Sequence, residues 1–347
     1  MKKVIVLSSI FLVIVLLNAC RKDDPTVDPY APTPYILEIP EGLPDMPIPA
    51  HNPLTVEGVA LGKKLFYDKI LSGDNTQSCG DCHLAQFAFT DPLQFSIGID
   101  GLPGTRNAMP IMNLGWQPGF FWDGGAADME SQVIGPIQNP VEMHESLANC
   151  IAELNAHPEY PDLFKAAFLV DEITTPYLMR AIAQFERTMI SGNSKYDKYV
   201  RGEVTLTEQE LLGMNLFTDM SKGDCNHCHV LGSTFSDFGY RNTGLDLVPV
   251  DEGRYLITLL ESDRGRFKTP SLRNIEFTGP YMHDGRFSTL MECIEHYNTE
   301  FFYTEKVDGN LATAVKGRMS LEEMQAIEAF LLTLSDTEFL TNPDFLP

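Results

Sequence analysis

Ser78-Cys79-Gly80-Asp81-Cys82-His83 is the stretch that decides the fold of this chain. Cys-x-x-Cys-His spacing lets two thiols bond the vinyl groups of a porphyrin while the adjacent imidazole reaches its iron. The same pattern returns as Cys225-Asn226-His227-Cys228-His229. The sequence therefore predicts two covalently attached c-type haems, and the position of His83 and His229 in the motifs indicates that each is an iron ligand.

Zinc ribbons and redox-active dithiols also use Cys-x-x-Cys pairs. Neither type of site needs a histidine directly after the second cysteine. The two pairs of a zinc ribbon usually lie about 15–20 residues apart, whereas more than a hundred residues separate these motifs. The pattern therefore favours haem attachment over both alternatives.

The length of 347 residues makes two domains the expectation, one for each motif, and an apolar content of 44% suffices for packed cores. The formal net charge of -23 argues against nucleic acid and anionic membrane surfaces as partners. A basic or neutral protein partner remains possible. Of the seven cysteines, four belong to the motifs, which leaves Cys20, Cys150 and Cys293.

The N-terminus has the charge pattern of a signal peptide. Lys2 and Lys3 precede an apolar run over residues 4–17, which is short for a membrane span. The run ends at Asn18-Ala19-Cys20, which resembles a bacterial lipoprotein box. We therefore expect residues 1–20 to be a lipoprotein signal peptide with lipidation at Cys20; an ordinary secretory signal is the alternative.

Either signal predicts export, with the protein facing the periplasm or lying on the outer cell surface. A lipid on Cys20 would then be its only membrane attachment. Residues 21–49 are rich in proline and aspartate and lack periodicity, so we expect a linker that contributes no core.

The folded part carries an internal duplication. A Leu-Gly-x-x-Leu-Phe-x-Asp pattern precedes both motifs, at residues 61–68 and 212–219, and Thr207 with Glu210 forms a capping box before the second. An Arg-Asn pair and then an aromatic-rich turn follow each motif. These repeated landmarks are Arg106-Asn107 with Phe121-Trp122-Asp123-Gly124, and Arg273-Asn274 with Met282-His283-Asp284-Gly285.

Further helices are expected around the junction and at the end of the chain. Thr175-Pro176 is typical of an N-cap with a first-turn proline, and Ser320 with Glu323 forms another capping box. The polar segment 191–202 is the expected connection. With no strand-rich alternation, we predict a mainly α fold of two tandem cytochrome c-like haem domains with long loops, at residues 50–200 and 201–347.

These motifs together resemble the bacterial dihaem cytochrome c peroxidase and MauG family from about residue 52 to about residue 298. The segments that carry the resemblance are the two haem motifs, Trp122-Asp123-Gly124, residues 135–143 and residues 269–285. The resemblance implies that the N-terminal haem performs peroxide chemistry and the C-terminal haem stores and relays electrons. It also assigns His83 and His229 as proximal ligands.

Peroxide chemistry needs an open distal face on the first haem and a group that moves a proton between the two oxygens. By its match to the family segment, Glu142 would be this acid–base group and Gln138 a polar neighbour in the pocket. His144 is expected to be a bystander. The alternative for Glu142 is a surface carboxylate of an acidic protein.

Many peroxidases of this family carry a histidine on the loop after the first motif that blocks the iron until the second haem is reduced. The matching place is Ile99, and no histidine lies between His83 and His144. The first haem should therefore be five-coordinate and ready without reductive activation, as in MauG.

The resemblance also places the sixth ligand of the second haem seventeen residues after Pro280, at Tyr297. This ligand is methionine in the ordinary peroxidases and tyrosine in MauG. A phenolate favours oxidised iron and should give the second haem a low potential. The rival ligands are His296, Met282 and Met291.

Three further assignments follow from the family pattern. Trp122 would lie between the haems and carry a hole in steps, with plain packing as the alternative. A calcium ion would bind at Asn107, Thr278 and Pro280, largely through backbone carbonyls. The remaining cysteines, Cys150 and Cys293, are expected to be buried thiols, and a disulfide between them stays open.

The expected function is therefore reduction of hydrogen peroxide to water with electrons from a small donor protein such as a cytochrome c. The first alternative is a MauG-like enzyme that oxidises residues of a protein substrate through a high-valent dihaem state. The second is a dihaem electron carrier without catalysis, which would leave Glu142 and Gln138 without a purpose.

Overall fold

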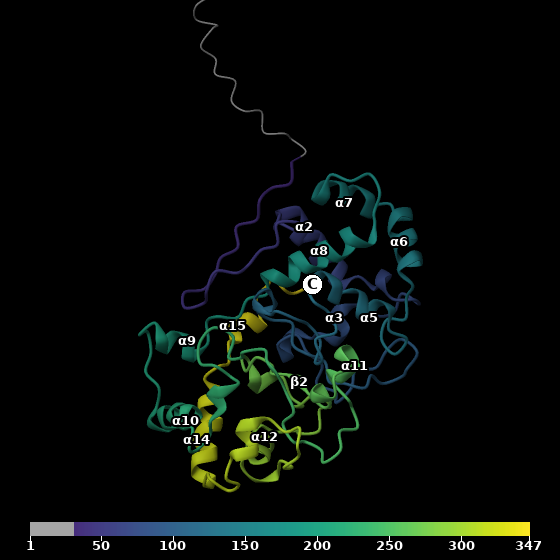
Figure 1. Cartoon of the computed structure of the whole chain (residues 1–347). Coiled ribbons are helices and arrows are strands. Elements are labelled where there is room, and N and C mark those ends of the chain that lie inside the picture. The colour runs from purple at the N-terminus through teal and green to yellow at the C-terminus, as the bar shows by residue number, and fades with distance from the viewer. Residues whose placement is uncertain (1–30) are drawn as a thin grey trace, which may run out of the picture. The chain divides into compact units, whose positions relative to one another are not determined.

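Helices dominate the computed structural model, which describes residues 31–347, and the predicted mainly α fold is confirmed (Figure 1). The predicted signal peptide and Cys20 lie outside these residues. Within residues 31–347 the only sheet is an antiparallel pair of short strands, β1 (Tyr240–Arg241) and β2 (Phe267–Lys268). None of the helices in this range has the length and apolar character needed to cross a bilayer.

The first half of the chain holds α2 (Val56–Tyr67), α3 (Cys79–Cys82), α4 (Met129–Gln132), α5 (Ile134–Gln138), α6 (Leu147–Ala156), α7 (Tyr160–Phe168) and α8 (Thr175–Thr188). The second half holds α9 (Lys195–Val200), α10 (Glu208–Thr218), α11 (Tyr255–Thr258), α12 (Leu290–Glu295), α13 (Gly309–Thr313), α14 (Leu321–Leu332) and α15 (Thr337–Leu340). Short 3₁₀ turns are η1 (Lys69–Leu71), η2 (Ala85–Phe87), η3 (Leu114–Trp116), η4 (Cys225–His227), η5 (Glu261–Asp263) and η6 (Ile275–Phe277), and η7 (His296–Glu300) is a π-helix.

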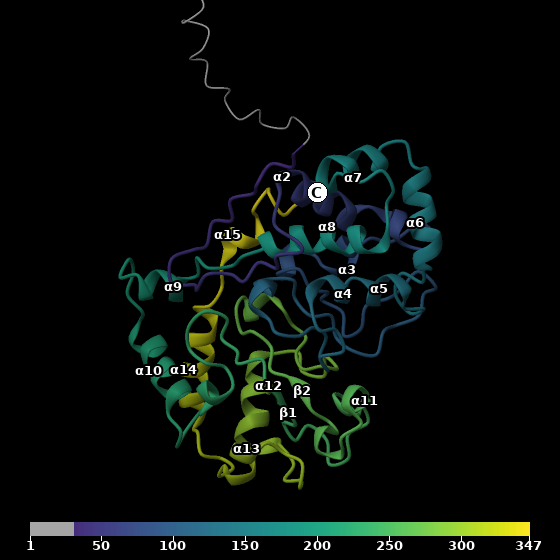
Figure 2. The ribbon, with the colours of Figure 1, turned by 45° about the horizontal axis from the view of Figure 1, so that its top comes forward.

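The predicted duplication is visible as two equivalent helix pairs. Helix α2 packs against α8, and α10 packs against α14 (Figures 1 and 2). Each pair needs a glycine at the crossing, because a Cβ at Gly62 would collide with the Ala181 carbonyl and a Cβ at Gly213 with the Ala326 carbonyl. The Leu-Gly-x-x-Leu-Phe pattern thus specifies a close helix crossing in both halves.

Helix starts follow the predicted capping residues closely. The capping boxes of Thr207 with Glu210 and of Ser320 with Glu323 are confirmed at the starts of α10 and α14. The helix expected at Thr175-Pro176 is α8. Its N-cap is Thr174 rather than the expected Thr175, so Thr175 is its first helical residue. Proline fits at the first or the second position of a helix, because the backbone N–H at each of these positions has no intrahelical acceptor.

The part of the predicted linker that the structure describes is packed rather than free. Met46 is buried against Gly115, and the Trp116 indole Nε1 donates to the Pro44 carbonyl at 3.1 Å. The expectation that residues 21–49 contribute no core is therefore wrong in this part. A proline-rich composition removes regular periodicity, but it leaves the side chains free to pack.

Core clusters among the described residues follow the two halves of the chain, with one exception. Two clusters are built mainly from α2, α7, α8 and the first-half loops, and a third from α10, α12 and α14. Phe339 and Phe345, from the end of the chain, pack in a first-half cluster that includes Phe89. The last residues therefore share a core with the half from which they are most distant in sequence.

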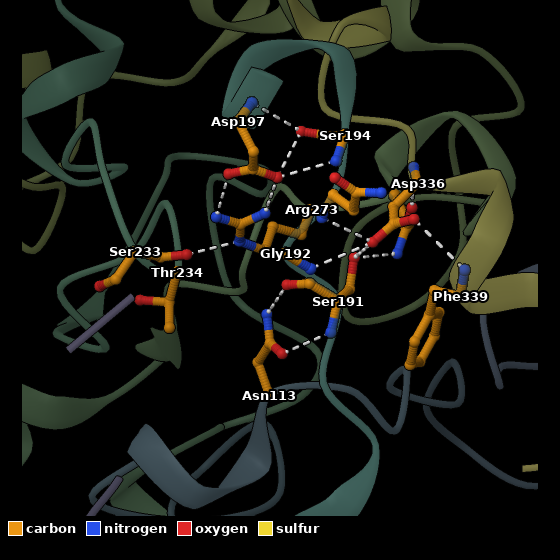
Figure 3. A network of polar contacts seen from close by, with 12 residues as sticks. Asn113, Ser191, Gly192, Ser194, Asp197, Ser233, Thr234, Arg273, Asp336 and Phe339 are labelled. Atoms are coloured by element: carbon orange, nitrogen blue, oxygen red, sulfur yellow. Dashed lines mark hydrogen bonds and ion pairs between the residues drawn. The ribbon is translucent and has the colours of Figure 1, made fainter. Parts of the chain in front are cut away.

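The polar connection at residues 191–202 is buried at its start, and this is where the two halves are tied together (Figure 3). Ser191 exchanges two hydrogen bonds with the Asn113 side chain, through its N–H (2.8 Å) and its carbonyl (2.9 Å). The Asp336 carboxylate accepts from the Ser191 hydroxyl and the Gly192 N–H, both at 3.0 Å. Every bond satisfies a group that burial would otherwise penalise.

An ion pair sits at the centre of this network. Arg273 is 1% exposed and donates from its two Nη atoms to the two oxygens of Asp197, at 2.8 and 2.9 Å. Burial by itself would raise the pKa of Asp197. The Arg273 guanidinium and the Ser194 hydroxyl and N–H outweigh burial and hold the pKa below its ordinary value.

We predict that Asp197→Asn lowers the free energy of unfolding by about 3–5 kcal/mol, because it leaves a buried guanidinium without its counter-charge. Chemical denaturation measures the change. The control is Asp171→Asn, which removes the same charge from the exposed pair with Lys165 and should leave the midpoint nearly unchanged.

The pH dependence gives a second check. A lowered folded pKa means that the Asp197 contribution is present above the unfolded pKa of about 3.9 and is lost as pH falls through the folded value. Asp197→Asn should lack this acid-side loss. Equal unfolding free energies for the wild type and Asp197→Asn would contradict this role of the pair.

Candidate haem sites

The first motif forms one wall of a large cavity. Cys79, Cys82 and His83 line a space of about 1080 Å³, which is the size of a cofactor pocket. Asp81, the second of the two residues between the cysteines, shapes the motif locally. Its Oδ2 accepts from the Ser78 N–H (2.8 Å) and hydroxyl (2.9 Å) at the start of α3. This capping box turns the motif into a helical turn that ends at His83.

His83 is oriented by a backbone carbonyl. Its Nδ1 lies 2.7 Å from the Phe89 oxygen, and since a carbonyl only accepts, Nδ1 carries the proton and Nε2 keeps a free lone pair. Burial lowers the pKa of His83 and so favours the neutral imidazole. A neutral ring with its second nitrogen held by a carbonyl is the usual state of a metal-bound histidine.

The two thiols are unsuited to dithiol redox chemistry. Both are free, and burial raises the pKa of Cys79 and brings that of Cys82 to about 11. A redox-active pair needs at least one thiol with a lowered pKa. Two protonated thiols and an imidazole on one wall of a large cavity fit a covalently held haem.

Glu142 lines the same cavity. Burial raises its pKa, and a hydrogen bond from Asn139 Nδ2 to Glu142 Oε1 at 2.6 Å partly opposes this. The backbone is fixed on both sides, because the Glu142 N–H donates to Asn139 and its carbonyl accepts from Ile99. The structure thus places a carboxyl group with a raised pKa in the cavity, as a proton-transfer group requires.

Gln138 does not occupy the pocket position expected for it. It is exposed at the C-terminal end of α5 and is absent from the cavity lining, to which this part of the chain contributes the amide side chains of Gln132 and Asn139. The prediction for Gln138 is therefore corrected. Gly135 and Asn139, four residues apart, face the cavity, and Gln138 is rotated away from that face by one helical step.

Ile99 is likewise outside the cavity, and its neighbours Ile97 and Gly98 line it instead. A glycine at position 98 allows the loop to lie against residues 141–142, because a Cβ there would collide with the carbonyls of Val141 and Glu142. The conclusion drawn from Ile99 is unaffected, since the loop holds no histidine at any position. His144 is exposed and pairs with Asp100 at 2.6 Å.

Two buried ionisable residues of the cavity escaped the sequence analysis. Glu186 on α8 is 4% exposed, its Oε2 has no hydrogen-bond partner within residues 31–347, and burial raises its pKa to about 8. Lys268 is 2% exposed and donates to Gln117 Oε1 (2.7 Å) and the Gly119 carbonyl (2.9 Å). Burial lowers the pKa of Lys268 to about 7. A charged residue on the apolar face of α8 was the one available signal for Glu186.

Trp122 lies where the two halves meet. It lines the cavity, its Nε1 donates to the Asn107 carbonyl at 2.8 Å, and its own carbonyl accepts from the Lys268 N–H at 2.7 Å. Within residues 31–347, no group of three or more His, Cys, Asp or Glu side chains is arranged to hold a metal ion. The calcium expected at Asn107, Thr278 and Pro280 would use other oxygens and stays a prediction.

The second motif begins as the 3₁₀ turn η4 rather than as a capped α-helical turn, but its histidine makes the same kind of contact as His83. His229 Nδ1 lies 3.2 Å from the Phe235 oxygen, and burial lowers the pKa of His229 to about 4. Burial also raises the pKa of Cys225 and of Cys228 to about 12. Each histidine thus bonds a phenylalanine carbonyl six residues downstream.

The structure brings Tyr297 to the second motif. Burial raises the pKa of its phenol, and the nearby thiols of Cys293, Cys228 and Cys225 raise it further. Tyr297 lies on the π-helix η7, a distortion frequent at functional sites because it redirects side chains. The residue predicted as sixth ligand therefore lies near the thiols of the second motif, and its ligation of iron stays a prediction.

Two of the rival ligands have other roles. His296 is buried, and its Nε2 lies 3.0 Å from the Thr243 carbonyl, which occupies that nitrogen. Met291 packs against the second-half core. Cys150 and Cys293 are free thiols, so the structure contains no disulfide between them.

Comparisons with known proteins agree with this geometry. Residues 56–205 match the family model of di-haem cytochrome c peroxidases. Cytochrome c551 peroxidase of Nitrosomonas europaea is 37% identical, over 87% of this chain and 86% of that protein. Methylamine utilization protein MauG of Methylorubrum extorquens is also 37% identical, over 73% of this chain and 71% of that protein.

A solved MauG-like protein associated with microbial copper homeostasis superposes with a TM-score of 0.83 at 34% identity, covering 90% of this chain and 98% of that one. Family model, relatives and fold agree with the resemblance seen in the motifs. The chain therefore belongs to the dihaem cytochrome c peroxidase and MauG family, whose members use haem c.

Proposed function

We propose that this protein is a dihaem peroxidase that reduces hydrogen peroxide to water with electrons from a small donor protein such as a cytochrome c. The observation that carries the proposal is the cavity of about 1080 Å³ in which Glu142 and the first Cys-x-x-Cys-His motif meet. Haem one is attached at Cys79 and Cys82 with His83 as ligand, and haem two at Cys225 and Cys228 with His229 as ligand.

Haem one, when bound, supplies the iron at which peroxide binds. Glu142 takes a proton from one peroxide oxygen and returns it to the other, and Asn139 holds its carboxyl group in place. Gln132, Glu186 and Lys268 are among the further polar groups that line this cavity. Because residues 84–143 contain no histidine, this segment offers no imidazole that could block the iron, and peroxide reduction would need no prior reduction of haem two.

The alternative function is MauG-like oxidation of residues in a protein substrate. The position of Tyr297 favours it, since a phenolate ligand stabilises ferric iron at haem two. Trp122, at the junction of the halves, would then carry charge between the haems. A carrier without catalysis is the weakest candidate, because it gives the Glu142 cavity no role.

The proposal includes three features beyond the haem sites. Calcium binds at Asn107, Thr278 and Pro280 between the halves. Lipidation of Cys20 tethers the protein to a membrane, facing the periplasm or the cell exterior. Electrons arrive one at a time from a donor that is basic or neutral where it docks, because this chain carries a net charge of -23.

We predict that Glu142→Gln keeps both haems and lowers peroxide turnover by about 10²-fold or more, the usual loss for a general acid–base. Steady-state turnover with a reduced cytochrome c measures it, and His144→Gln is the control because His144 is exposed. The base form of Glu142 is needed and burial raises its pKa, so the acid limb of the wild-type pH profile lies above the ordinary carboxyl range. Wild-type turnover in Glu142→Gln would exclude Glu142 as the acid–base group.

We predict that Tyr297→Met keeps haem two six-coordinate and raises its reduction potential by about 100 mV or more, because a neutral thioether no longer favours ferric iron. A redox titration followed by optical spectra measures it. The control is Tyr303→Met, whose hydroxyl donates to the Ala314 carbonyl on the surface. An unchanged potential in Tyr297→Met would exclude ligation by Tyr297.

We predict that Cys20→Ser is exported and leaves the membrane fraction, because a lipid on Cys20 is the only proposed anchor. Fractionation of cells that express the wild type and the variant tests this expectation, with haem content confirming export. Retention of the exported variant in the membrane fraction would mean that another element provides the tether.

A further inference from the structure

The carbonyl groups that orient the two proximal histidines belong to residues in a rare backbone conformation. Phe89 has φ of 59° and Phe235 has φ of 50°, in the left-handed region that bulky residues seldom adopt. Neither position is a glycine, so the surroundings must hold each backbone there. At Phe89 they comprise the packing of the ring and two backbone hydrogen bonds, from the Phe89 N–H to the Leu84 carbonyl (3.0 Å) and from the Ile111 N–H to the Phe89 carbonyl (3.1 Å). Each ring is fully buried.

The packing that holds the two rings comes from different places. The Phe235 ring meets Tyr196 edge-on at 5.0 Å between centroids, and Arg273 lies over it at 5.6 Å. Both partners belong to the second half or to its connection. The Phe89 ring meets Phe339 at 5.4 Å and Phe345 at 6.4 Å, and these residues come from the far end of the chain.

Residues 337–347, which we call the C-terminal strap, are fixed at both ends. At its start, the Phe339 N–H donates to Asp336 Oδ1 at 3.2 Å, in the network of Figure 3. At its end, the Tyr67 hydroxyl donates to the Phe345 carbonyl at 2.5 Å, and Lys63 Nζ donates to the Pro343 carbonyl at 3.0 Å. Figures 1 and 2 both show the C-terminus beside α2 and α8 of the first half.

The strap therefore completes the proximal side of the first haem site from outside that half. Phe339 and Phe345 also contact each other, at 5.4 Å between centroids, so they form one aromatic unit against Phe89. Removing either ring would free space beside Phe89 and let the Phe89 carbonyl shift within the limits set by its backbone hydrogen bonds to Leu84 and Ile111. That movement would lengthen or break the 2.7 Å contact between His83 Nδ1 and the Phe89 oxygen.

We propose that the C-terminal strap positions the proximal ligand of haem one: Phe339 and Phe345 hold the Phe89 carbonyl where it accepts from His83 Nδ1. The hydrogen bond fixes the imidazole orientation and makes the ring a stronger donor to iron. The second half thereby sets the reduction potential of haem one through packing rather than through a ligand. This inference rests on the proposed ligation by His83.

The direct test uses Phe339→Leu, Phe345→Leu and their double variant in the full-length dihaem protein. The readouts are the iron–histidine stretching band of the reduced protein, measured by resonance Raman spectroscopy, and the potentials of both haems. We expect the band to shift to lower frequency. The potential of haem one should rise by about 59 mV in the double variant, a tenfold change for a one-electron couple, while haem two stays unchanged.

The control is Phe168→Leu, which removes a partly buried ring that packs against the first-half core beside Phe164 and Tyr177 and is not a ring partner of Phe89. It should leave the band and both potentials at wild-type values. Leucine keeps most of the buried apolar volume, so the test does not depend on whether an alanine variant folds. A double variant with the wild-type band and potential, or an equal shift in Phe168→Leu, would overturn the proposal.

His83→Gly separates this inference from the proposed function. Loss of the iron–histidine band in His83→Gly establishes that the band reports on His83, and the strap variants then test positioning alone. Survival of the band in His83→Gly would overturn the ligand assignment and the inference with it.

Discussion

A Cys-x-x-Cys-His motif holds its porphyrin by one edge and one face, so every other contact must come from residues that are distant in sequence. This constraint explains why the fold consists of two small helix pairs surrounded by long loops. At the first site Glu142 and Gly98 line the same cavity as the motif. At the second site the π-helix carries Tyr297 toward the thiols. The helix pairs provide a frame, and the loops decide what each haem site can do.

The predictions that held rest on short-range chemistry. The capping boxes at Thr207 and Ser320 depend on neighbours within a few residues. Such patterns fix local geometry whatever the rest of the chain does. The mainly α fold followed from such local patterns and from the family resemblance. The roles of Glu142 and Tyr297 stay predictions, for which the structure places Glu142 in the cavity and Tyr297 near the thiols of the second motif.

The predictions that failed depend on which way a side chain faces or on what covers a segment. Gln138 was separated from the cavity by one helical step, a rotation that a motif match does not resolve. The start of the connection at Ser191 has the polarity of an exposed linker but is buried, since Asn113 and Asp336 satisfy it from far away in the sequence. The sequence around Lys268 gives no sign that this lysine is buried. Its acceptors, the Gln117 side chain and the Gly119 backbone, come from the other half.

The duplication suggests two self-sufficient domains, and the buried polar groups argue against that independence. Asp336 receives three hydrogen bonds from residues 191–193, and Asn274 bonds both Ser191 and the Asp336 N–H. A first half expressed alone would lose these partners together with Phe339 and Phe345, and it would expose the Phe89 ring. Buried polar groups without partners cost free energy for each group. The two halves are therefore repeated in sequence but completed only in each other's presence, which keeps the two haem sites in a fixed relation.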